Sequence, residues 1–295
     1  MSTLVEILAP DFLLRNALVG SVLVGVVCPL VGVYFVLRRM IFLGVALPQL
    51  SAAGVAFAFL MSSLAQVHRH GETAERVLAM CGSLGFAFVG LVVLAALERQ
   101  GRETVEARIG VTYALAAAAS ILFVAADPYG EAEMTHLLKG DIVTTTTASL
   151  DVLMAVFGTV AVALFAFRKE LLLVSFDRDM AVVLGKRAAL WDTLLYLLIG
   201  VTISFGVMTA GPLVTFGFLV APPLTARLVT RHMLTFSIVA ALLGGVTAFV
   251  GFTVSYRWDL PLGPTDVALA VAVLLVVAGW QGFARVVGAR RHRGS

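Results

Sequence analysis

Histidines and carboxylates with the spacing of metal ligands occur together in one short stretch of the chain. His68 and His70 are followed by Glu72 and Glu75 in the same polar segment. Histidine nitrogens and carboxylate oxygens bind zinc, but two histidines alone rarely fix a metal ion. We therefore favour a solvated loop over residues 66–76, with a metal site as the alternative.

A second polar segment, residues 168–187, interrupts a strongly apolar sequence. Asp177 and Asp179 come just before an amphipathic run, and Gly185 is placed where a helix would end. The pattern predicts a short surface helix between two apolar stretches, which could contact a soluble partner. The residues alone favour the simpler interpretation of a solvated loop.

Polar side chains at membrane depth occur in the apolar run at residues 41–65. Pro48 should kink or break a helix there, and Gln49 and Ser51 are polar. Small residues from Ala52 to Ala58 would allow a neighbouring helix to approach closely. Two interpretations stay open: a kinked packing helix whose Gln49 bonds to a neighbour, and a helix that lines a transport path.

Several catalytic motifs are missing from the sequence. It contains no phosphate-binding G-x-x-x-x-G-K-[ST] loop, no H-E-x-x-H and no G-x-S-x-G. The chain is therefore not expected to bind ATP itself or to be an enzyme, and no cofactor is expected in it. An integral-membrane enzyme is a weaker alternative, since it would need a clustered acid, base or metal set.

The composition is that of a membrane protein with many spans. Hydrophobic residues make up 60% of the 295 positions, charged residues make up 13%, and the mean hydropathy is +1.00. A soluble domain carries about 25% charged residues. We expect one transmembrane domain over residues 1–295, in contact with membrane lipid. No cluster of basic and aromatic residues suggests a nucleic-acid partner.

Nine runs are apolar and long enough to cross the hydrocarbon core as helices of about 20 residues. The fold class is therefore all-α, a polytopic transmembrane helical bundle of eight or nine spans. Only Gly211–Pro212 separates the sixth run from the seventh, so a tight turn or a broken helix would both fit. The nine runs are 12–37, 41–65, 77–97, 109–126, 149–167, 188–210, 212–230, 233–254 and 264–284.

The distribution of charge predicts the orientation. With the N-terminus outside and nine spans, 16 of the 21 Lys and Arg residues fall in inside loops and 5 fall outside. This split obeys the positive-inside rule, and merging the sixth and seventh runs would spoil it. The C-terminus and the segment 168–187 are then cytoplasmic.

The middles of the predicted spans contain essentially no Asp, Glu, Lys or His. Proton-coupled carriers usually bury an ionisable residue in a span because it couples the fluxes. This absence argues against a proton-coupled carrier. An ATP-independent carrier or channel remains an alternative, and it would transport its cargo without a partner.

Five stretches in register resemble the membrane permease subunit of the metal-type ABC importers, which take up zinc, manganese or iron. The first is an arginine-rich stop that leads into the second span, and the fourth is a span with internal prolines before Thr-Ala-Arg. The stretches are Phe35–Leu60, Leu137–Ile142, Val174–Leu198, Gly211–Thr230 and Asp259–Pro264. Their order and spacing agree with the family over roughly residues 12–284.

The resemblance implies a type II-like ABC importer permease in a bacterial plasma membrane, working by alternating access. It implies a homodimer, two cytoplasmic ABC ATPase subunits that bind ATP, and an external metal-binding protein that delivers the cargo. The cytoplasmic segment 168–187 would then carry the coupling helix. The residues expected to couple to the ATPase are Asp177, Asp179, Met180, Leu184, Gly185 and Lys186.

The sequence departs from the family in the second span. The family there reads Gly-Asp-x-x-x-His, and this chain has Gly44, Val45 and Gln49. Val45 cannot ligate an ion, and Gln49 offers only a neutral amide oxygen, a weak ligand that favours hard cations. We expect Val45, Gln49 and Ser51 to line the path. A divalent metal ion, zinc or manganese before iron, is the expected cargo, with a metal chelate or another small solute as the alternative.

Overall fold

The computed structural model describes residues 12, 14–64, 72–98, 105–127, 142 and 146–292, and the regular structure in these residues is helical. Helices α2 to α5 precede a long gap in this description, and α7 to α12 follow it. The helices are α2 (Arg15–Leu37), α3 (Leu43–Leu64), α4 (Glu72–Glu98), α5 (Val105–Ala126), α7 (Thr147–Ala166), α8 (Arg168–Phe176), α9 (Arg178–Val183), α10 (Ala188–Val229), α11 (Met233–Trp258) and α12 (Leu262–His292).

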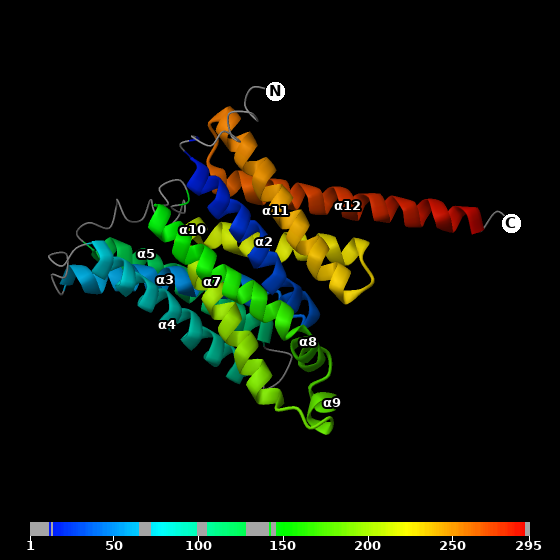
Figure 1. Ribbon diagram of the computed structural model, residues 1–295, viewed down its shortest axis with the longest axis horizontal. Helices are drawn as coiled ribbons and strands as arrows, with labels where there is room; N and C mark the ends of the chain where they lie inside the picture. The colour runs from blue at the N-terminus through cyan, green and yellow to red at the C-terminus, as the bar shows by residue number, and fades with distance from the viewer. Residues whose placement is uncertain are drawn as a thin grey trace.

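Seven of these helices are long and apolar enough to cross a membrane, and α4 contains a shorter apolar stretch, Val77–Val93. The 42-residue α10 is too long for one crossing of about 20 residues. Its backbone leaves helical geometry at Gly211, where φ is 83°, immediately before Pro212. Glycine adopts this conformation without steric cost. The break expected at Gly211–Pro212 is therefore present, and Figure 1 shows the chain changing direction within α10.

Helix α2 is the element around which the others are arranged. It packs against α10, α11 and α7, and in Figure 1 it runs between α7 and α11. Helices α3, α4 and α5 form a second group in which α3 contacts both of the others. Helix α10 contacts α2, α3, α4, α11 and α12, so it joins the two groups.

Glycines set how closely these helices approach. A Cβ on Gly32 of α2 would overlap the carbonyl oxygen of Leu219 in α10. A Cβ on Gly244 of α11 would overlap the carbonyl oxygen of Gly25 in α2 in the same way. A Cβ on Gly54, in the small-residue stretch of α3, would likewise overlap the carbonyl oxygen of Gly82 in α4. Small residues thus permit the close packing that the sequence predicted for the second span.

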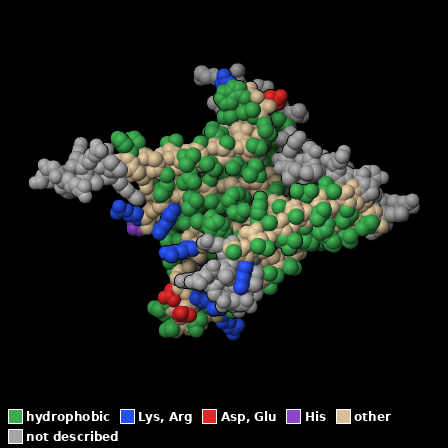
Figure 2. All heavy atoms as spheres, turned by 180° about the vertical axis from the view of Figure 1, so that it is seen from behind, with side chains coloured by type: hydrophobic (Ala, Val, Ile, Leu, Met, Phe, Trp, Pro, Cys, Tyr) green, Lys and Arg blue, Asp and Glu red, His purple; other side chains and the backbone are tan. Residues whose placement is uncertain are grey.

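The outer surface is apolar over the middle of the molecule. Figure 2 shows hydrophobic side chains covering this region, while most of the visible Lys and Arg side chains gather toward one side. Helix α12 extends away from the rest of the bundle in Figure 1. It exposes large apolar side chains along its length, including Leu275, Val276, Trp280 and Phe283.

One carboxylate is fully buried near the start of α12. Ser21 of α2 donates a hydrogen bond to Asp266 Oδ2 at 3.0 Å, and Asp266 has no exposed surface. Gly251 of α11 leaves the room that Asp266 Oδ1 occupies, because a Cβ there would overlap this oxygen. Asp266 is the third residue of the predicted span 264–284 and thus lies near its start. Its burial could not be predicted from the sequence.

We expect Gly32→Ala to destabilise the protein by about 1–3 kcal/mol, the usual cost of overpacking a tight contact. The added methyl would push α2 away from the Leu219 carbonyl. Gly20→Ala, on the same helix, is the matched control, since a Cβ there has nothing within 4 Å. Thermal melting of both variants in detergent is the measurement. Equal melting temperatures for the two variants would contradict the packing argument.

Candidate functional site

The segment between α7 and α10 folds into two short helices joined at Asp177. Helix α8 ends there because the backbone of Asp177 is extended, with φ at −147°. The Asp177 side chain then starts α9, since its Oδ1 accepts a hydrogen bond from the Met180 backbone N–H at 2.8 Å. This is the N-cap arrangement in which a side-chain oxygen satisfies a free backbone donor. Asp177 thereby fixes the angle between α8 and α9.

The end of α9 is closed by Gly185. Its φ of 73° lies in the left-handed region, and its N–H donates to the Val182 carbonyl at 2.9 Å. The Lys186 N–H donates to the Ala181 carbonyl, also at 2.9 Å. This pair of bonds is a Schellman motif, which glycine favours at this position. The helix stop expected at Gly185 is therefore present.

All apolar side chains of α9 except Ala181 are exposed, as is Leu184 directly after the helix. Ala181 is fully buried and packs with Val174 and Ala188, whereas its neighbours are exposed. We define the α9 apolar face as Met180, Val182, Val183 and Leu184, with exposed fractions of 48%, 59%, 80% and 55%. Contiguous exposed apolar side chains on a polar segment mark a contact surface.

Charged side chains join this segment to the ends of α2 and α10. Arg38 Nη2 lies 2.8 Å from Asp192 Oδ1, and Arg38 Nε donates to Ser175 Oγ at 3.0 Å. Arg178, at the start of α9, donates to Asp192 Oδ2 at 3.1 Å. The Arg38 guanidinium also lies 5.6 Å from the centre of the Tyr196 ring. We refer to these five residues as the Arg38 cluster.

The ion pair at the centre of the Arg38 cluster is largely buried, so breaking it is costly. The side chains of Arg38 and Asp192 are only 10% and 16% exposed, whereas Arg178 is 54% exposed. Removing one partner of a largely buried ion pair leaves the other charge desolvated, which is costly. Arg38 is the residue directly after α2, and α3 begins five residues later at Leu43. Arg38 therefore lies between the α8–α9 segment and the start of α3.

The remaining predicted coupling residues are at the surface. Lys186 Nζ lies 3.6 Å from Glu170 Oε1 of α8, with both side chains partly exposed. Asp179 is exposed in the first turn of α9, where a negative charge favours the helix. The six predicted coupling residues thus share one segment, but Asp177 and Gly185 shape its backbone whereas Met180 and Leu184 present side chains.

The predicted path residues of α3 do not share one face. Val45 and Gln49 are one helical turn apart and partly exposed, and Gln49 Nε2 donates to Ser120 Oγ of α5 at 3.3 Å. Ser51 is fully buried, and its Oγ lies 2.6 Å from Ser83 Oγ of α4. Ser51 thus turns toward the neighbouring helix α4.

The Ser51–Ser83 contact continues into a third helix. Ser83 Oγ donates to Ser204 Oγ of α10 at 3.0 Å, so three buried hydroxyls link α3, α4 and α10. Sequence reasoning missed Ser83. A serine next to Gly82, within a small-residue stretch, is the only signal that could have indicated it.

Val45, Gln49 and the hydrogen-bond partner of Gln49, Ser120, are neutral. Within the described part of the chain no three His, Cys, Asp or Glu side chains gather as metal ligands. Amide and hydroxyl oxygens, as at Gln49 and Ser120, suit hard cations and bind softer ones weakly. His68, His70 and residues 137–141 lie outside the described residues, as do the side chains of Glu72 and Glu75.

Known proteins resemble this chain over most of its length. The zinc transport system membrane protein TroC of Treponema pallidum (strain Nichols) is 27% identical over 271 residues, 90% of this chain and 88% of that protein. The manganese import system permease protein ScaB of Streptococcus gordonii is 22% identical over 263 residues, 89% of each chain.

The fold is shared with a chain of known structure. A chain in the structure of PsaBC from Streptococcus pneumoniae in complex with Fab superposes with a TM-score of 0.79 and 21% identity, covering 94% of both chains. A model of the ABC 3 transport family matches residues 11–281. Since that match runs from just before α2 far into α12, the chain belongs to the ABC 3 transport family.

Proposed function

We propose that this chain is the membrane permease subunit of an ATP-driven importer for a divalent metal ion, manganese or zinc before iron. The α9 apolar face carries the proposal, because a surface of this kind on a polar segment needs a partner. The partner that fits is a separate ABC ATPase subunit, which would bind and hydrolyse ATP. Membership of the ABC 3 transport family and the names of the zinc and manganese relatives support the cargo class.

The proposed complex contains two copies of this chain, two ATPase subunits and an external metal-binding protein. The single transmembrane domain, residues 1–295, would lie in a bacterial plasma membrane with its N-terminus outside. The break at Gly211 supports two crossings by α10, and with Val77–Val93 of α4 this gives nine spans. The C-terminus and residues 168–187 would then be cytoplasmic, in agreement with the positive-inside rule.

The proposed mechanism is alternating access driven from α9. The ATPase would dock on the α9 apolar face, and Asp179 and Lys186 would make polar contacts at its edge. Because Asp177 and Gly185 fix both ends of α9, the short helix would move as a rigid body. The Arg38 cluster would pass this movement to the adjoining ends of α2 and α3, and α3 carries Val45 and Gln49.

A second cargo class is favoured by one observation. Val45 and Gln49 stand where the family resemblance implies an aspartate and a histidine, and neither is a strong metal ligand. A path lined by neutral groups suits a metal chelate or a small organic solute, whose charge is already compensated. The same ATP-driven mechanism would apply to both classes.

The cargo is tested by an elemental profile of cells that express this chain with its ATPase in metal-depleted medium. We expect cellular manganese or zinc to rise severalfold, and a catalytically inactive ATPase is the control. No rise in manganese, zinc or iron, with the complex shown to assemble, would overturn the free-ion proposal and favour the chelate. A rise that persists with the inactive ATPase would instead indicate an ATP-independent carrier or channel.

We expect Val183→Asp to abolish docking of the ATPase, because it places a charge at the most exposed position of the α9 apolar face. Burying an unpaired carboxylate in an apolar contact costs several kcal/mol. Co-purification of the ATPase is the measurement. Ala189→Asp is the matched control, since it adds the same charge at an exposed position in the first turn of α10, where an acid is favourable. Normal co-purification with Val183→Asp would exclude docking on this face.

We expect Asp192→Asn to leave assembly and ATP hydrolysis intact but to lower cargo uptake per ATP by about tenfold. A hydrogen bond to a charged group contributes about 1.5–3 kcal/mol, and the Arg38 cluster loses its only carboxylate. Asp151→Asn, at an exposed position on α7, removes the same charge elsewhere. Uptake per ATP equal to that control would show that the Arg38 cluster does not transmit the movement.

A further inference from the structure

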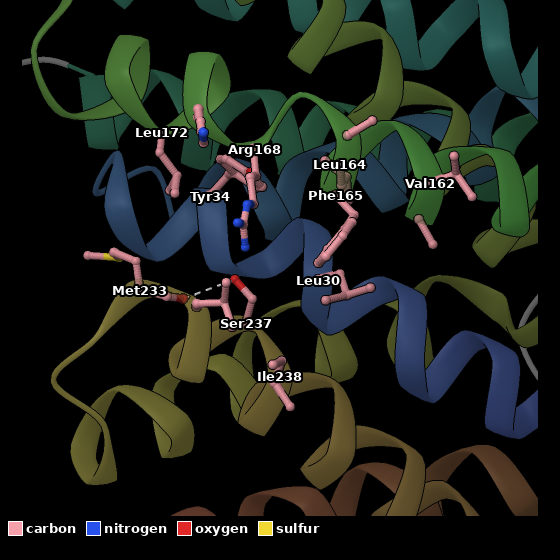
Figure 3. A pocket seen from close by; sticks show the side chains of 14 residues that line it. Leu30, Tyr34, Val162, Leu164, Phe165, Arg168, Leu172, Met233, Ser237 and Ile238 are labelled. Carbon is pink, nitrogen blue, oxygen red and sulfur yellow. Dashed lines mark hydrogen bonds between the residues drawn. The ribbon is translucent and has the colours of Figure 1, made fainter.

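A groove of about 660 Å³ opens on the outside of the bundle between α2, α7, α8 and α11. This volume is within the range of roughly 300–1,000 Å³ for sites that hold small molecules. Figure 3 shows side chains from all four helices converging on it, with Leu30 and Tyr34 from α2 and Ser237 and Ile238 from α11. No lining residue belongs to α3, which carries Val45 and Gln49, so the groove is not the proposed path.

The groove has an apolar lining with two cations at one end. Most of its side chains are aliphatic or aromatic, and its described lining residues include no carboxylate. Its polar members are Tyr34, Arg168, Lys169 and Ser237. Both cations are supplied by the first turn of α8. An occupant should therefore have a long apolar part and a negative charge at one end.

The two cations have no carboxylate partner in the part of the chain that the structure describes. Within the described residues neither Arg168 nor Lys169 forms an ion pair, and the adjacent Glu170 lies instead near Lys186. The Arg168 guanidinium lies 5.1 Å from the centre of the Phe165 ring, a contact that leaves its charge uncompensated. Figure 3 shows Arg168 pointing into the groove toward Ser237.

Three long apolar helices each have one terminus near these cations. Helix α7 ends at Ala166, just before Arg168, and α2 ends at Leu37, three residues beyond Tyr34. Helix α11 begins at Met233, which also lines the groove. The other end of the groove, at Leu30, Ala161 and Ile238, lies farther along these spans. The groove thus runs from the membrane interface into the hydrocarbon region.

We infer that this groove binds one anionic phospholipid, with its phosphate between Arg168 and Lys169 and an acyl chain along Leu30, Val162 and Ile238. Basic pockets between transmembrane helices bind anionic lipid headgroups, and each cation near the surface adds to the affinity. Tyr34 and Ser237 can contribute hydroxyl contacts. Only the choice of membrane leaflet rests on the proposed function. In the proposed orientation the lipid would lie in the cytoplasmic leaflet.

The test is native mass spectrometry of the full-length chain from nanodiscs that contain equal amounts of dioleoyl phosphatidylglycerol and dioleoyl phosphatidylcholine. We expect one phosphatidylglycerol to be retained in preference to phosphatidylcholine. The double variant Arg168→Gln/Lys169→Gln should lower its retention at least tenfold. Arg187→Gln/Arg231→Gln removes two exposed cations outside the groove and should retain the lipid. Transport is not measured, so failure here is distinguishable from failure of the proposed function.

A second pair of variants tests the apolar end of the groove. Ala161→Trp should displace the lipid by filling the groove, whereas Val152→Trp, at an exposed position on α7 outside the groove, should not. Equal retention of both lipids, or no loss in either groove variant, would overturn the inference. A cross-link between two copies through Ser237→Cys, without retained lipid, would show that the groove is a protein interface instead.

Discussion

The close contact of α2 with its neighbours is the constraint on which the rest of the bundle depends. Lipid chains are as apolar as the helix surfaces, so burial of apolar groups drives helix association weakly in a membrane, and packing at short range must replace it. Gly32 brings α2 onto the backbone of α10, and the contact of Gly25 with Gly244 brings it onto α11. Because α10 also contacts α3 and α4, the second helix group is held through the same element.

This packing also fixes the position of Arg38, the residue that follows α2. A charged side chain that is only 10% exposed requires partners at set places, and Asp192 and Ser175 supply them from α10 and α8. The packing of α2 and the position of the α8–α9 segment are therefore linked through Arg38. An apolar residue at position 38 would have packed as well, but it would not have tied three elements together through directional bonds.

The length of the apolar runs and turn chemistry predicted the local features correctly. The apolar runs match helices, Gly211 breaks α10, and Gly185 ends α9, because each signal lies within a few residues of its effect. Contacts between distant residues left no such signal. Asp266 bonds to Ser21, 245 positions away, and Ser83 joins Ser51 to Ser204. The partner of a buried polar group depends on helix rotation and depth, which hydropathy does not determine. The expectation that Ser51 lines the path together with Val45 and Gln49 took no account of this rotation.

The neutral side chains of Val45 and Gln49 and the Arg38 cluster are consistent with one division of roles, weak cargo binding and movement of helices. An importer must release its cargo, so strong ligands in the path would slow transport unless the conformational change weakened them. Neutral oxygens such as those of Gln49 and Ser120 bind weakly and would require little energy for release. Selectivity for the cargo must then come from groups other than Gln49 and Ser120. Under the proposed function, the energy from ATP would be used mainly to move helices through the Arg38 cluster, and less to detach an ion from its ligands.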